Sequence, residues 1–301
     1  MIRKGLLYMC CLLAVCGSRV MAQEGIEKND LQLLQGYEHD MVLITDSMYH
    51  APIVDLRSIY CGQLARLLVK ALKIPNSYAY PFEKLGEKIN IIAPDDKSFR
   101  IFNWSMLQTE VTLRYYGAIQ MNSPQLKLYP LIDCSGDLGK AAEDTVLTGG
   151  GKWFGALYYR IMTQETDGGK LYTLFGVNKG NVISTRKVME ALTFSPGGPV
   201  FGAPVFQVRD DNGTFAVKHR FILEYKKEVN ASLNWDDDMK LVVFDRLISQ
   251  VNDPNRKYTF VPSGQYDGLR WRDGRWNWVD DLIPVQAMKD GDAPAPQPRK
   301  K

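Results

Sequence analysis

The three histidines of the chain, His39, His50 and His219, do not stand at the spacing of a common zinc motif. His39 lies between Glu38 and Asp40, an arrangement that could orient an imidazole for proton transfer. The same residues suit the solvated face of a helix, and this second interpretation is favoured. The sequence therefore predicts neither a metal site nor a cofactor.

Carboxylates offer a second kind of chemistry, because a glycosidase needs only two of them beside the scissile bond. Such pairs have no fixed spacing, so any two of Asp95, Asp133, Glu224 and Asp245 could serve as acid and base. The acidic run Asp236–Asp238 lacks the alternating spacing of a calcium loop and is interpreted as a turn. The sequence contains no phosphate-binding loop and no serine-hydrolase elbow.

Aromatic residues gather around Asp273–Gly274, a dipeptide preferred in two-residue type I′ hairpins. The resulting register pairs Trp271 with Trp276 and places Trp278 on the same strand face. Together with Tyr266, these tryptophans form a candidate platform for a sugar ring or a protein anchor. The alternative is burial, because large aromatic side chains on one strand face belong more often to a core.

The N-terminus has the order of a secretory signal: two basic residues, an apolar run too short to span a bilayer, and small residues ending at Ala22. We expect cleavage between Ala22 and Gln23, and therefore a periplasmic or secreted protein. A buried N-terminal helix is a less favoured interpretation. A lipoprotein signal at Cys16 is also less favoured, because Val15 is bulkier than such a site prefers.

Cys61 and Cys134 are the only cysteines beyond residues 1–22. An exported chain meets an oxidising compartment, so a Cys61–Cys134 disulfide is predicted. Two buried free thiols are the alternative. A catalytic thiol is the least favoured interpretation of Cys61.

Without residues 1–22 the chain has 34 basic and 34 acidic side chains. A neutral chain lacks the broad positive field that nucleic acids require, so nucleic-acid binding is disfavoured. No later apolar run reaches membrane-spanning length. The expected partner is a protein or a glycan of the cell envelope.

The elements that must position these residues divide the chain into regions. Residues 23–80 are predicted to form an N-terminal helical segment, and residues 81–285 a β-rich domain of short strands separated by turns. The Pro-rich residues 286–301 are predicted to be a disordered tail. The expected fold class is mainly β with an N-terminal helical segment (α+β), with an antiparallel meander, sandwich or propeller-like sheet.

Five segments carry a resemblance to known proteins: Ala93–Ile101, Pro199–Phe206, Arg220–Tyr225, Val243–Leu247 and Ser263–Leu269. They resemble a family of exported proteins from Bacteroides-type bacteria that has no assigned activity. The resemblance covers roughly residues 85–282 and rests on the order and residue pattern of these segments rather than on a catalytic motif. It implies export and β architecture, and it contributes no site residues.

Two functions remain open on the sequence. The favoured one is an exported, non-catalytic binding or assembly module, and the alternative is a glycosidase-like hydrolase with two dispersed carboxylates. A cleft holding two carboxylates about 5–10 Å apart beside exposed tryptophans would favour the hydrolase. A closed aromatic core would favour the module.

Overall fold

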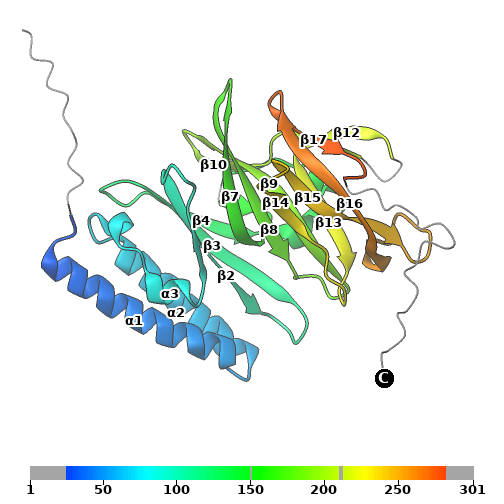
Figure 1. The fold of residues 1–301 in the computed structure, drawn as a ribbon. Coiled ribbons are helices and arrows are strands. Elements are labelled where there is room, and N and C mark those ends of the chain that lie inside the picture. Colours follow the sequence, from blue (N-terminus) through cyan, green and yellow to red (C-terminus); the bar gives the residue numbers. More distant parts are fainter. Residues whose placement is uncertain (1–24, 150, 210–212, 283–301) are drawn as a thin grey trace, which may run out of the picture.

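A computed structural model describes residues 25–149, 151–209 and 213–282. The predicted signal peptide, its cleavage site and the predicted tail at 286–301 lie outside these residues. The chain forms two long helices and three β-sheets. Figure 1 shows that they follow one another as layers. The fold is mainly β with an N-terminal helical segment, as the sequence predicts. The sheets are mostly antiparallel and remain open within the described residues, so the propeller-like alternative does not form.

The helical layer consists of α1 (Lys28–His50) and α2 (Val54–Leu72), which are joined by three residues and pack side by side. Leu34, Met41 and Met48 recur at a helical period on the buried face of α1. Two short turns, η1 (Ser77–Ala79) and α3 (Glu83–Gly86), lead from the helices into the first sheet.

The first sheet has the order β1-β2-β3-β4-β6, and its members are β1 (Asn90–Ile92), β2 (Phe99–Leu107), β3 (Leu113–Met121), β4 (Leu128–Asp133) and β6 (Lys152–Trp153). Both faces of β2 are buried. Phe102 and Trp104 belong to the core shared with the helices, whereas Phe99 and Ile101 belong to the core shared with the second sheet. The period of two along a strand explains this division.

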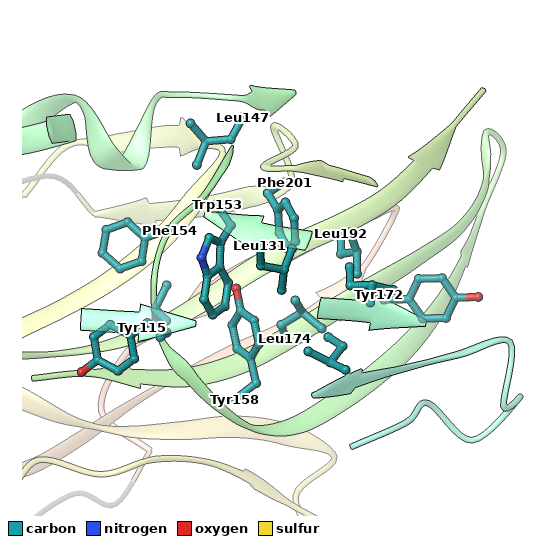
Figure 2. Close-up of a cluster of buried hydrophobic side chains, with 14 of the residues drawn as sticks. Tyr115, Leu131, Leu147, Trp153, Phe154, Tyr158, Tyr172, Leu174, Leu192 and Phe201 are labelled. Atoms are coloured by element: carbon teal, nitrogen blue, oxygen red, sulfur yellow. The ribbon is translucent and has the colours of Figure 1, made fainter. Parts of the chain in front are cut away.

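The second sheet has the order β5-β10-β9-β8-β7, and its members are β5 (Leu147–Thr148), β10 (Gly198–Phe201), β9 (Ser184–Ser195), β8 (Gly169–Asn178) and β7 (Leu157–Thr166). One further strand, β13 (Arg220–Lys226), pairs with the first half of β9 on the same edge that β10 occupies further along. Figure 2 shows the core between the first two sheets, where Trp153, Tyr158 and Phe201 meet at full burial. Between β4 and β5 the chain forms α4 (Ser135–Leu138) and η2 (Gly139–Glu143).

The third sheet has the order β12-β11-β17-β16-β15-β14, and its members are β12 (Phe215–Lys218), β11 (Phe206–Arg209), β17 (Arg275–Val279), β16 (Phe260–Arg272), β15 (Leu241–Ser249) and β14 (Leu233–Asp236). A short turn, η3 (Lys257–Thr259), stands between β15 and β16. The predicted hairpin is confirmed: Trp271 pairs with Trp276, and Asp273 and Gly274 both have positive φ, at 54° and 73°. A further core separates this sheet from the second one.

The predicted Cys61–Cys134 disulfide is wrong, because both cysteines are free. Cys61 lies in the core between the helices and the first sheet, where Trp104 Nε1 donates a hydrogen bond to its sulfur at 3.3 Å. Cys134 packs against the core on the other side of that sheet, and its thiol donates to the Trp153 carbonyl at 3.1 Å. The first sheet therefore lies between the two sulfurs. Burial raises the pKa of both thiols, which opposes a role as thiolate nucleophiles.

Candidate functional site

The three tryptophans of the predicted platform lie together, but not as an open surface. Trp276 has no exposed surface, and its Nε1 donates to Thr173 Oγ1 of the second sheet at 3.0 Å. Trp271 is half-buried and meets the Trp276 ring edge to face, with centroids 5.4 Å apart. Trp276 belongs to the core between the second and third sheets, and Trp271 packs against that core.

The other two platform residues have different surroundings. Trp278 is half-buried, contacts Phe244 at a centroid distance of 4.9 Å, and lines a large groove. Tyr266 pairs with Asp245 across β15 and β16, and the alternation along β16 points it away from the face that carries Trp271. The structure therefore brings three tryptophans together, leaves Tyr266 on the opposite face, and gives only Trp278 access to a cavity.

This groove lies at the margin between the second and third sheets and has a volume of about 1020 Å³. That is the upper end of the roughly 300–1,000 Å³ of small-molecule sites. Six stretches of chain line it: residues 139–143, 181–186, 218–224, 244–247, 254–260 and 278–281, together with isolated residues between them. We refer to this cavity as the margin groove.

One wall of the margin groove is the outer edge of β13. Four consecutive residues, Phe221 to Glu224, line the groove. Successive side chains of a strand point to opposite faces, so a cavity touched by all four lies along the edge of the strand rather than on one face. Within the described residues, β13 has only one strand neighbour, β9.

A second wall is η2, which a buried ion pair holds against β13. Arg220 and Glu190 are both fully buried and bonded to each other, and Arg220 also donates to the Ala142 carbonyl of η2. Tyr158 donates to the other Glu190 oxygen at 2.5 Å. Burial raises the pKa of Glu190, against the opposing charge of Arg220. These contacts satisfy two buried charges and at the same time fix the position of η2.

The far end of the groove carries two arginines that form three ion pairs with aspartates. Arg209 donates to both oxygens of Asp280, at 3.1 and 2.6 Å, and these bonds lower the pKa of Asp280. Arg246 contacts both oxygens of Asp267 and also reaches Asp281 at 2.7 Å. The hydrogen bond to Asp267 raises the pKa of Arg246. Two arginines thus pair with three aspartates, and every charge at this end has an opposite charge beside it.

Arg186 differs from these arginines. Its Nε lies 3.1 Å from Glu224 Oε2 but is not aligned with that oxygen, and it is buried without a hydrogen bond. Among the described residues, no hydrogen bond is formed by its two terminal nitrogens. Arg186 also lines a second cavity of about 490 Å³ beside the margin groove. A guanidinium with unused donors is able to bind an anionic group, and here it stands at the junction of two cavities.

The structure brings two of the four candidate carboxylates to the margin groove. Glu224 and Asp245 both line it, whereas Asp133 lines the second cavity and Asp95 lies exposed in a turn. Asp245 accepts hydrogen bonds from the amide and the hydroxyl of Ser232 at 2.6 and 2.7 Å. Glu224 accepts one from a serine hydroxyl and lies against Arg186. Both carboxylates thus have partners within the protein.

The remaining candidates from the sequence are His39 and the acidic run Asp236–Asp238. His39 is exposed while Glu38 is buried and accepts from Tyr80 and the Leu85 amide, so the two do not act as a pair. Asp236 accepts from two backbone amides in the turn between β14 and β15, as a turn interpretation requires. The described part of the chain holds no cluster of three or more His, Cys, Asp or Glu that could bind a metal ion.

The margin groove was not predicted from the sequence. Its walls come from segments up to about 140 residues apart along the chain, so no local motif marks it. The free edge of β13 has no sequence signal either, because it depends on which strands pair. None of the described helices is long and apolar enough to cross a membrane.

Comparisons with protein-family models, with curated protein sequences and with solved structures find no match to this chain. The assignment of a function therefore starts from the geometry of the groove.

Proposed function

We propose that this chain is an exported, non-catalytic binding module of the cell envelope, and that the margin groove holds its ligand. The observation that carries this proposal is a groove of about 1020 Å³ that combines a free strand edge, apolar side chains and an arginine with unused donors. Such a cavity offers shape, backbone hydrogen bonds and charge to a ligand. The resemblance to exported proteins and the N-terminal signal support the cellular location.

A hydrolase with Glu224 and Asp245 is the alternative, because both carboxylates line the groove. The partners of both argue for the binding module. Asp245 accepts hydrogen bonds from the amide and the hydroxyl of Ser232, and Glu224 lies against Arg186, so both carboxylates already have partners within the protein. The only tryptophan that lines the groove, Trp278, donates its Nε1 to Asp280 at 3.1 Å and is half-buried.

The test uses the chain from Gln23 to its end and two sets of probes: random 12-residue peptides, and soluble gluco-, xylo- and manno-oligosaccharides. Ile183 lines the groove and is 50% exposed, and its neighbour Val182 is 53% exposed but does not line it. Ile183→Glu therefore blocks the groove, and Val182→Glu is a matched control for a new charge on the same loop.

We expect at least one class of probe to raise the melting temperature of the wild type and of Val182→Glu, and Ile183→Glu to bind it at least tenfold more weakly. Mass spectrometry of the bound probe should show no cleavage. If no probe discriminates between the two variants, the groove is not the ligand site. If a probe is cleaved and Glu224→Gln stops the cleavage, the hydrolase is correct and the module is not.

Export is tested separately on protein from its native host. We expect the mature chain to begin at Gln23, so N-terminal sequencing and intact mass give the result. A chain that still begins at Met1, or one with a lipid on Cys16, would contradict the proposal.

A further inference from the structure

The geometry points to an extended polypeptide as the ligand of the margin groove: it adds a strand to the free edge of β13, with an acidic side chain directed at Arg186. This inference rests on the proposed function and names the class of ligand and its mode of binding. The free edge, the side chains above and below it, and the arginine each contribute one part of the argument.

The direction of the backbone groups of β13 follows from two contacts. The Lys227 amide donates to the Ile183 carbonyl at the start of β9 at 3.1 Å, so odd-numbered residues direct their backbone groups at β9. The Ile222 amide donates the other way, to Glu143 Oε1 at 3.2 Å. Glu224 therefore directs both its N–H and its C=O into the groove, where neither finds a partner among the described residues.

An edge strand with unpaired backbone groups is a template for another strand. Here the template lies inside a cavity, and the Glu143 carboxylate already occupies the amide donor at Ile222. An added strand would exchange two hydrogen bonds with Glu224, as a directly opposed pair does in an antiparallel ladder. This is the mode by which extended peptides bind exposed sheet edges.

The side chains on the two faces of β13 determine which side chains of the ligand fit. Phe221 and Leu223 point toward the core between the second and third sheets, so the added strand meets apolar surface on that side. On the other side, Arg186 stands directly across from Glu224 in the β9–β13 pair. Arg186 pairs with Glu224 through Nε, and among the described residues its terminal nitrogens form no hydrogen bond, so a carboxylate of the ligand can accept from them. The groove thus fits a segment in which apolar and acidic residues alternate.

The test isolates the backbone of one residue. Glu224→Pro removes the outward N–H and places a ring in the path of the added strand, but it removes no hydrogen bond to β9, and proline is tolerated at such edge positions. Glu224→Ala is the matched control, since it loses the same side chain and keeps the N–H. The probe is a phage library of random 12-residue peptides, selected on the wild-type chain and resynthesised for calorimetry.

We expect enriched peptides with alternating apolar and acidic residues. Their affinity should fall at least tenfold in Glu224→Pro and less than threefold in Glu224→Ala. Circular dichroism and melting temperature verify that both variants are folded. If Glu224→Pro does not fold, the same comparison is made by amide hydrogen exchange on the wild type, where bound peptide should protect the Glu224 amide.

Each other outcome has a distinct meaning. Peptides that require Ile183 but bind Glu224→Pro normally would overturn strand addition and leave the proposed function intact, and so would binding of oligosaccharides alone. Binding only to a chain that ends at Leu282 would show that residues 283–301 occupy the groove, which also overturns the inference. Absence of any groove ligand removes both proposals.

Discussion

Truncation of one hairpin tryptophan separates a structural role from a surface role. The Trp276 side chain has no exposed area, contacts Trp271 and Trp235 edge to face, and donates to Thr173. A buried tryptophan removes about 150–250 Å² from water, which at about 25 cal/mol per Å² corresponds to about 4–6 kcal/mol. Alanine recovers part of this, and measured substitutions of this kind cost about 3–5 kcal/mol.

We expect Trp276→Ala to lower the free energy of unfolding by about 4 kcal/mol. Thr173 adds little to the loss, because it keeps a hydrogen bond with Gln164 at 2.8 Å. The assay is urea denaturation with the slope compared between variants, so that a change in midpoint reports stability. Arg272→Ala on the same hairpin is the control, since its side chain is 75% exposed. A loss below about 0.5 kcal/mol, the usual scatter of surface substitutions, would refute the core assignment of Trp276.

Three further predictions concern other parts of the fold. Arg220→Met leaves the buried Glu190 without its partner and should cost about 3–5 kcal/mol in a urea melt, whereas a loss below about 1 kcal/mol would mean that the pair is not buried in solution. In the chain from Gln23, thiol labelling should find two reactive cysteines in unreduced, unfolded protein and slow labelling in the native state, where burial raises both pKa values; absence of labelling in that unfolded chain would restore the disulfide. Burial acts to raise the pKa of Asp96, but hydrogen bonds from neighbouring side chains outweigh it and lower that pKa. The stability from Asp96 is therefore present above the unfolded pKa of about 3.9 and lost as the pH falls further, so Asp96→Asn should show a shallower acid limb in the pH dependence of stability.

The terminal hairpin could be predicted because every signal for it is local. Asp273 and Gly274 accept positive φ, and the alternation on both sides fixes which side chains share a face. The same rule shows why Tyr266 does not join the tryptophans: it stands an odd number of residues from Trp271. The prediction of a platform with Tyr266 did not take this odd spacing into account.

The disulfide prediction failed for a different reason. A count of cysteines carries no information on distance, and a bridge requires Cα atoms within about 7 Å. Cys61 is one of the buried residues of α2. Cys134 comes directly after the last residue of β4 and packs on the opposite side of the first sheet. The order of the layers that separates them arises from tertiary packing, which a count of cysteines does not predict.

The margin groove follows from how one long strand shares its edge. β9 has 12 residues, and β8 occupies one of its edges. The opposite edge is divided between β10, which takes residues 192–195, and β13, which takes residues 184–190. The outer edge of β10 pairs with the two-residue strand β5. Among the described residues, the outer edge of β13 pairs with no strand. This side of the sheet is therefore covered beside β10 and unpaired beside β13. Along β13 the side chains of Phe221, Leu223 and Tyr225 are buried, whereas those of residues 222, 224 and 226 are only half-buried. Whether such a strand has one neighbour or two is decided by the rest of the fold, and among the described residues β13 has no second neighbour at the point where the groove lies.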